Sequence, residues 1–379
     1  MQYRMVELGT VIKPAQTVRC GDNEYPVLSM TMHDGLIFQD EKFKKAIASS
    51  DKSAYKVVYR NQLVISFPID EGVLAAQRIV DAGIVSPAYG IWDINQEKII
   101  PEYLEYALRC PRALSYYKAK LRGSTARRRS LPTSTLLAFT IPLPSINEQQ
   151  RVLDIIHSAK HVQDTRKQQI QQLDELVKAR FVEMFGDQES NPFGWKQLTI
   201  GECCTLKSGT SLPAEVENEG GSIPYVKVGD MNYPGNERYI TTSSRFVTVE
   251  TAGKGLFDVG SIIFPKRGGA IGTNKKRMTK LPICADLNVM GVSSNGELVP
   301  EYLLAYFDMI DMGNLADGSS VPQINNKNIA PLLICVPPME KQVEFVTFVK
   351  QLDKSKVAVQ AALDEARFLF DSLMQKYFG

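Results

Sequence analysis

The chain has 379 residues, which is long enough for two domains and an additional helical part, and its apolar content is ordinary for a folded protein. Its formal net charge of +2 excludes a protein that is basic over its whole surface, so any argument for nucleic-acid binding must rest on local clusters. Six cysteines are scattered without a C-x-x-C pair, the start lacks an apolar signal-peptide core, and the longest apolar runs are too short to cross a bilayer. We therefore expect a cytoplasmic protein without membrane segments.

The first part of the chain alternates short β-like runs with loops. Runs rich in Val, Ile, Tyr and Phe at 25–30, 55–59 and 62–67 are separated by Gly, Pro and Asn, which predicts strands joined by loops. Residues 101–121 have a proline at an early position and apolar residues at helical spacing, so we expect one helix there. A further strand is expected at 136–144.

A long segment without Gly or Pro follows, from residue 147 to residue 185. Its apolar residues recur at three- and four-residue spacing, with a polar midpoint at 166–169. About 38 residues at a rise of ~1.5 Å each predict a helix roughly 57 Å long. One such helix cannot bury its apolar stripe alone, so a partner helix is expected.

The second part of the chain has the same kinds of elements in the same order. Strands are expected at 222–228, 238–242, 245–249 and 260–264. The chain closes with a second long helical segment, from Glu340 to Phe378, whose apolar positions match those of the first segment.

An internal repeat relates the two parts. When RFVEMFG at 180–186 is aligned with LMQKYFG at 373–379, Gln149 falls on Gln342. Three further matches keep the same order along the chain: VELG at 6–9 with LTIG at 198–201, LVISFP at 63–68 with SIIFPK at 261–266, and IPEYLEYAL at 100–108 with VPEYLLAYF at 299–307. Chance similarity is the alternative, and the shared order argues for a tandem duplication.

The duplication predicts a mixed α+β architecture with an internal pseudo-twofold repeat. Two similar globular α/β domains are expected to be separated by a pair of long helices that bury their stripes against each other as an intramolecular coiled coil. A coiled coil with another chain is the alternative for the same stripe. The expected segments are 1–144 for the first globular domain, 145–186 for the first long helix, 187–337 for the second globular domain and 338–379 for the second long helix.

A search for catalytic patterns finds little. There is no G-x-S-x-G, no P-loop and no dinucleotide-binding glycine loop. His157 and His161 have the spacing of a zinc pair, but no glutamate of an H-E-x-x-H motif and no third ligand accompany them, which favours a solvated helix face. The only acid-x-Lys, Asp40 to Lys42, lies in a polar stretch typical of a surface. We therefore expect no catalytic, cofactor or metal site.

Two basic segments without acidic residues are more informative, one in each copy of the repeat. The second contains RGGAIGTNKKR, whose glycines would let a phosphate backbone approach closely. A solvated loop that balances acids elsewhere is the alternative for either segment. The candidate DNA-binding residues are Arg122, Arg127, Arg128 and Arg129 in the first segment and Lys266, Arg267, Lys275, Lys276 and Arg277 in the second.

The segment IPLPSINEQQRV at 141–152, continued by FVEMFGD at 181–187 and GWKQLTIG at 194–201, resembles the specificity subunits of type I restriction-modification systems. The family has a proline-containing strand, Glu-Gln, a long helix ending in Phe-x-x-Met-Phe-Gly-Asp, and Gly-Trp at the start of the next unit. The second copy departs from this pattern, with Lys341 before Gln342 and with Cys335 where the first copy has Pro142.

The resemblance implies that each globular domain is a target-recognition domain for one half of a bipartite site in double-stranded DNA. It also implies that the two long helices pack antiparallel, set the spacing, and dock two methyltransferase subunits, which bind S-adenosylmethionine and methylate adenine. Restriction subunits that translocate DNA would join the complex. The chain itself is then expected to be non-catalytic and without a cofactor. The alternatives are a single-chain DNA methyltransferase or nuclease, and a coiled-coil scaffold that binds only protein.

Overall fold

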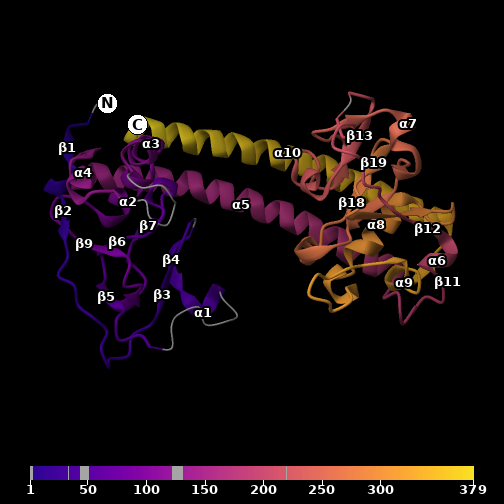
Figure 1. The fold of residues 1–379 in the computed structure, drawn as a ribbon, viewed down its shortest axis with the longest axis horizontal. Coiled ribbons are helices and arrows are strands. Elements are labelled where there is room, and N and C mark those ends of the chain that lie inside the picture. The colour runs from indigo at the N-terminus through magenta and orange to yellow at the C-terminus, as the bar shows by residue number, and fades with distance from the viewer. Residues whose placement is uncertain (1–2, 33, 43–50, 122–130, 219) are drawn as a thin grey trace. The chain divides into compact units, whose positions relative to one another are not determined.

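The computed structural model describes residues 3–32, 34–42, 51–121, 131–218 and 220–379 (Figure 1). Helices and strands are mixed throughout. The chain forms two compact units: unit 1 consists of Met1–Arg166 and Ala361–Gly379, and unit 2 consists of Lys167–Gln360.

Unit 1 contains a four-stranded antiparallel sheet and three strand pairs, with short helices between them. The sheet has the order β2 (Ile12–Pro14), β9 (Gly90–Ile94), β6 (Leu63–Ile65), β7 (Leu74–Ala76). The pairs are β1 (Met5–Glu7) with β10 (Thr140–Pro142), β3 (Leu28–Thr31) with β4 (Gly35–Phe38), and β5 (Lys56–Tyr59) with β8 (Ala82–Val85). The helices are α1 (Gln39–Lys42), α2 (Pro101–Arg109), α3 (Pro111–Lys120) and α4 (Thr133–Leu137), with 3₁₀ turns η1 (Leu8–Thr10) and η2 (Ile69–Glu71).

Unit 2 contains a five-stranded sheet, a four-stranded sheet and one strand pair. The larger sheet has the order β12 (Cys204–Ser208), β20 (Val289–Ser294), β17 (Ile262–Pro265), β18 (Arg277–Thr279), β14 (Tyr239–Ile240). The smaller has the order β15 (Phe246–Val247), β13 (Ile223–Val226), β19 (Ile283–Ala285), β16 (Leu256–Phe257), and β11 (Lys196–Thr199) pairs with β21 (Leu333–Val336). The helical elements are α6 (Ile200–Cys203), η4 (Val228–Asn232), α7 (Val249–Ala252), η5 (Gly253–Gly255), η6 (Gly268–Thr273), α8 (Pro300–Asp308), η7 (Met312–Leu315) and α9 (Asn326–Ile329).

The main sheets of the two units share their strand order. Strands β2-β9-β6-β7 of unit 1 correspond in chain order and pairing to β12-β20-β17-β18 of unit 2. The turn before the central strand also recurs, because Asn61 and Gly260 both have a positive φ, of 67° and 87°, just ahead of β6 and β17. The sequence repeat is therefore a repeat of topology.

Two helices of 40 residues, α5 (Ile146–Phe185) and α10 (Met339–Phe378), match the two expected long helices. In unit 2 they run antiparallel, because Asp174 forms an ion pair with Lys356 while Arg180, further along α5, pairs with Glu344 at 3.3 Å. In unit 1, Gln163 Nε2 of α5 donates to the carbonyl oxygen of Ala366 in α10 at 3.2 Å.

Two expected elements differ from the structure. The helix expected over 101–121 is broken at Cys110, whose extended backbone (ψ 156°) separates α2 from α3. Pro111 causes the break, because a residue before proline is disfavoured in the helical region. The strand expected over 136–144 is confined to β10, and α4 occupies the residues before it.

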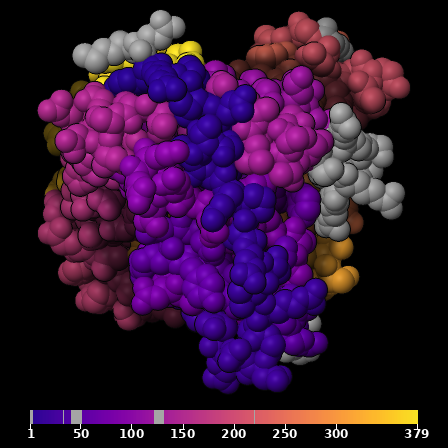
Figure 2. Space-filling view, turned by 90° about the vertical axis from the view of Figure 1, so that its left-hand side faces the viewer, coloured from indigo at the N-terminus to yellow at the C-terminus, as the bar shows by residue number. Residues whose placement is uncertain are grey.

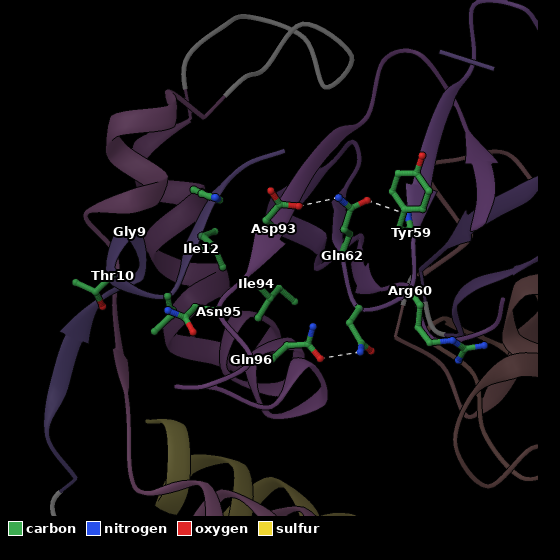
Figure 3. A pocket seen from close by; sticks show the side chains of 13 residues that line it. Gly9, Thr10, Ile12, Tyr59, Arg60, Gln62, Asp93, Ile94, Asn95 and Gln96 are labelled. Carbon is green, nitrogen blue, oxygen red and sulfur yellow. Dashed lines mark hydrogen bonds between the residues drawn. The ribbon is translucent and has the colours of Figure 1, made fainter. Parts of the chain in front are cut away.

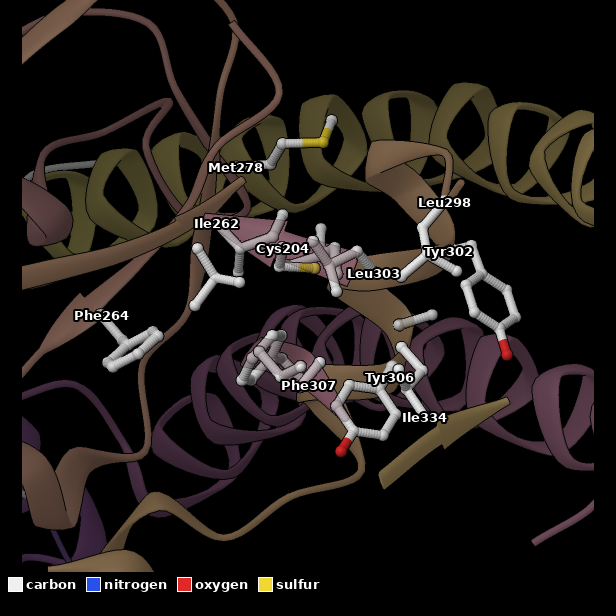
Figure 4. Close-up of a cluster of buried hydrophobic side chains, with 14 of the residues drawn as sticks. Cys204, Ile262, Phe264, Met278, Leu298, Tyr302, Leu303, Tyr306, Phe307 and Ile334 are labelled. Atoms are coloured by element: carbon white, nitrogen blue, oxygen red, sulfur yellow. The ribbon is translucent and has the colours of Figure 1, made fainter. Parts of the chain in front are cut away.

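The end of each long helix is buried against a tyrosine that occupies the same place in the repeat. Phe185, at the end of α5, packs on Tyr302 of α8 in unit 2 with ring centroids 4.8 Å apart. Phe378, at the end of α10, packs on Tyr103 of α2 in unit 1 at 5.0 Å. Figure 4 shows side chains of α8, including Tyr302 and Phe307, in the apolar core of unit 2. Each unit is thus completed by the helix that begins in the other copy.

A buried glutamine near the start of each long helix makes the same three hydrogen bonds in both units. In unit 1, Gln149 Oε1 accepts from the backbone N–H of Ile100 at 2.8 Å, and its Nε2 donates to the carbonyls of Lys98 and Pro144. In unit 2, Gln342 makes the equivalent set with Val299, Glu297 and Pro337. We call this arrangement the glutamine clamp. It ties the long helix to the segment just before α2 or α8.

We predict that Gln149→Leu lowers the free energy of unfolding by roughly 1–3 kcal/mol, because the buried backbone groups of the clamp lose their partner. Urea denaturation of the full chain measures the change. The neighbouring exposed Gln150 provides the control, since Gln150→Leu should change the value by only about 0.5 kcal/mol or less. Equal effects of the two substitutions would show that the clamp does not support the fold.

Candidate nucleic-acid interface

Four loops of unit 2 meet at one end of its larger sheet. The backbone N–H of Lys266 donates to Asn288, that of Ile324 donates to Lys266, and that of Gly268 donates to Pro322, all at 2.8–2.9 Å. The N–H of Gly209 donates to Val289 at 2.9 Å. We call residues 208–210, 265–277, 286–288 and 317–324 the loop edge of unit 2. It contains all five of the basic residues that the sequence predicts in this unit.

Two of these lysines are half-buried and bound to polar side chains. Lys266 Nζ donates to the hydroxyl of Ser208 at 2.9 Å. Lys275 Nζ donates to Oδ1 of Asn232, at the end of η4. Both partners are neutral, and neither ammonium has an ion pair within the described residues.

Lys276 lies in the interior, with only 5% of its surface exposed. Its ammonium donates to the carbonyl of Ile310 at 2.7 Å and to Asn274 Oδ1 at 2.8 Å, and the same Oδ1 accepts from the backbone N–H of Met312. Burial lowers the pKa of Lys276 to about 8, although Asp308 nearby opposes the shift. The structure therefore places Lys276 as a tie between the basic loop and the segment after α8.

Arg277 is also turned toward the protein. Its guanidinium donates to the backbone carbonyls of Asn236 at 2.5 Å and Lys276 at 2.8 Å. Burial lowers the pKa of Arg277. These bonds join β18 to the loop before β14.

Arg267 differs from the other four. It is exposed, and within the described residues no hydrogen bond or ion pair of its guanidinium is found. Its backbone pairs with Gln323 in an isolated antiparallel bridge.

Sequence reasoning missed the polar residues that support the loop edge. Asp286 is buried, and its carboxylate accepts from the hydroxyl of Tyr225 and from both nitrogens of Asn288. Burial and the nearby Asp286 carboxylate raise the pKa of Tyr225, so its hydroxyl stays protonated and donates. The only sequence signal for this turn was the Asp-x-Asn at 286–288, which is too common to identify a site.

The predicted basic residues of unit 1, Arg122 and Arg127 to Arg129, lie outside the described residues. The residues that flank them, Leu121 and Leu131, line a cavity of about 160 Å³ together with Phe67 and Pro68 after β6. In the repeat, the segment between Leu121 and Leu131 corresponds to 317–324. Phe67 and Pro68 correspond to the loop after β17. By this sequence correspondence, the two predicted basic clusters belong to different segments of the repeat.

A groove of about 590 Å³ in unit 1 lies at the opposite end of β6 (Figure 3). It is lined by amides, with Asn61 donating to Gln96 at 2.8 Å and Gln62 donating to Asp93 at 2.7 Å. Figure 2 shows the face of unit 1 that its N-terminal segments cover. Gly260 replaces Asn61 in unit 2, so this amide lining does not recur there.

In the described part of the chain, no group of three or more His, Cys, Asp or Glu residues could hold a metal ion, and His157 pairs with Glu102 at 2.9 Å. The six cysteines are buried and unbridged. Among the described residues, no helix is long and apolar enough to cross a membrane.

Comparison with known proteins gives a consistent result. Residues 192–366 match the family described as the type I restriction modification DNA specificity domain. The chain is 24% identical over 307 residues to the type I restriction enzyme MjaIX specificity subunit of Methanocaldococcus jannaschii, covering 75% of this chain and 69% of that protein. It is 23% identical to the putative MjaX specificity subunit of the same organism, covering 68% and 63% of the two chains.

Solved structures with a similar fold are also known. One is a chain from a structure of complex assembly and conformational transition in a type I restriction-modification system, with a TM-score of 0.60 and 19% identity over 100% of this chain and 97% of that one. Another is the S subunit of a type I system from M. genitalium, with a TM-score of 0.51 and 15% identity, covering 100% and 96%. At these identities the likeness shows the fold.

We predict a pH dependence of stability from the buried Lys276. The pKa of Lys276 is about 8 in the folded protein, whereas the ordinary value for a lysine is 10.5. Between pH 8 and pH 10.5, the unfolded chain therefore holds a proton that the folded chain has released. Folding is then increasingly favoured as the pH rises through this window. The free energy of unfolding of the wild type, relative to Lys276→Met, should rise between about pH 8 and 10.5 and stay constant below it.

Chemical denaturation at a series of pH values measures this difference. Lys254→Met, at an exposed lysine of the same unit, controls for the loss of one charge. Parallel curves for the wild type and Lys276→Met would contradict the interior placement of the ammonium.

Proposed function

We propose that this chain, which is related to the specificity subunits of type I restriction-modification systems, selects the DNA sequence on which such a complex acts. Specificity subunits are the non-catalytic members of these complexes, and the chain shares that role. The observation that carries the proposal is the duplicated unit, with the same sheet order and the same glutamine clamp in both copies. Two equivalent units suit a bipartite site, because each can bind one half of it.

DNA would lie against the loop edge of unit 2 and the corresponding loops of unit 1. Lys266, Lys275 and Arg267 would contact phosphates or bases in unit 2, whereas Lys276 and Arg277 would hold the loop in shape. In unit 1, Arg122 and Arg127 to Arg129 would play the corresponding part, as the sequence predicts. Because each phosphate contact releases counterions, binding would weaken as salt increases.

The long helices would serve as a spacer between the two halves of the site. In this proposal, target-recognition domains at 1–144 and 187–337 are joined by the helical segments 145–186 and 338–379. The antiparallel contacts of α5 and α10 inside unit 2, and the hydrogen bond between Gln163 and Ala366 inside unit 1, support the pairing. The complex would act on cytoplasmic DNA.

Exposed apolar side chains on the long helices favour docking of other subunits. Phe368 and Leu369 of α10 are 75% and 53% exposed, and Leu176, the repeat equivalent of Leu369 on α5, is exposed as well. Large apolar residues left in water at equivalent positions suit two copies of one partner. We propose that two methyltransferase subunits dock there and supply S-adenosylmethionine, with restriction subunits joining the assembly.

We predict that replacing residues 1–144 with the first domain of another specificity subunit changes one half of the methylated site and leaves the other half unchanged. The physical reason is that each unit has its own hydrophobic core. Sequencing of methylated adenines in cells that carry the chain with its methyltransferase tests this. A change in both halves would contradict modular recognition.

We predict that Leu176→Glu with Leu369→Glu weakens methyltransferase binding by at least roughly tenfold, because a carboxylate would be buried in an apolar interface. Co-purification and titration measure the affinity. Gln351→Glu adds one carboxylate at an exposed position of α10 and should bind like the wild type. Unchanged binding by the double variant would place the docking surface elsewhere.

A further inference from the structure

The bridge between Arg267 and Gln323 holds two polar side chains next to each other on the loop edge of unit 2. The two residues lie directly opposite each other in antiparallel pairing, so their side chains project from the same face about 5 Å apart. Both are long side chains with several donors or acceptors.

The backbone beneath this pair is fixed from both sides. Gly268 donates to Pro322 at 2.8 Å, and Ile324 donates to Lys266 at 2.9 Å. Gln323 is also tied to Asp317, whose carboxylate accepts from its N–H at 3.0 Å and whose own N–H donates to its carbonyl at 3.1 Å. A rigid base of this kind presents side chains with little loss of entropy on binding.

The side-chain ends of the pair are free in the described structure. Neither the guanidinium of Arg267 nor the amide of Gln323 has a hydrogen bond or ion pair among the described residues. The four other predicted basic residues of unit 2 all have their cationic groups bonded to protein atoms. Side-chain ends without hydrogen bonds among the described residues, on a fixed backbone, distinguish Arg267 and Gln323 from the four other basic residues of unit 2.

The chemistry of the pair matches the edges of purine bases. Arginine can donate two hydrogen bonds to O6 and N7 of guanine, and glutamine can bond N6 and N7 of adenine, both in the major groove. Resting on the function proposed above, we infer that Arg267 and Gln323 form a base-reading pair that recognises adjacent purines in the half-site bound by unit 2. Lys266 and Lys275, on either side of this loop, are placed for the phosphates.

Methylation mapping tests the inference with the full chain and its methyltransferase in cells. Variants Arg267→Ala, Arg267→Lys and Gln323→Ala are compared with the wild type and with Lys254→Ala, an exposed control in the same unit. A lysine keeps the positive charge that a phosphate contact needs, but it cannot donate the two parallel hydrogen bonds that an arginine gives to guanine. We expect both Arg267 variants to reduce discrimination at one base position by roughly tenfold. Gln323→Ala should do the same at a neighbouring position.

The affected positions should lie in the half-site that exchange of residues 1–144 leaves unchanged. A bipartite motif that both Arg267 variants preserve at every position would overturn the inference alone, because Arg267 would then read no base. A wild-type chain that directs no bipartite methylation would overturn the proposed function and this inference together. Thermal unfolding of each purified variant checks that the substitutions leave the fold intact.

Discussion

The glutamine clamp is the contact on which the architecture of each unit depends. An amide side chain has one acceptor and two donor hydrogens, and Gln149 uses them to satisfy one backbone N–H and two carbonyls in the interior. Leaving such groups unpaired would be costly, so the start of the long helix is held against the segment before α2. Gln342 repeats this in unit 2 with the same three kinds of partner, which makes the duplication visible at the level of single hydrogen bonds.

The loop edge follows a different physical rule, because its charges divide between interior and surface. Lys276 and Arg277 bond backbone carbonyls and hold the loop in one conformation. The side chain of Arg267 remains exposed, while its backbone forms an antiparallel bridge with Gln323. A basic segment therefore contains cations that hold the loop in shape and an exposed cation that is available to a ligand, and the contacts of each side chain distinguish the two kinds.

Much of the fold could be predicted from periodicity and repetition. The long helices begin and end within a residue of their expected limits, because a stretch without Gly or Pro and with regular apolar spacing has few alternatives. The single helix expected over 101–121 was wrong, since Pro111 forces Cys110 out of the helical region. The hydrogen bond between Tyr225 and Asp286 was not predictable, because the two residues are distant in the chain.

The sequence by itself determined the duplication, the two long helices, the resemblance to specificity subunits and the presence of a basic segment in each copy. Those features are encoded locally or by comparison of one part of the chain with another. Only the tertiary structure decided which basic side chains are buried, which residues surround them, and that Arg267 lies opposite Gln323. Burial and pairing of this kind depend on contacts between segments far apart in the chain, which no local pattern specifies.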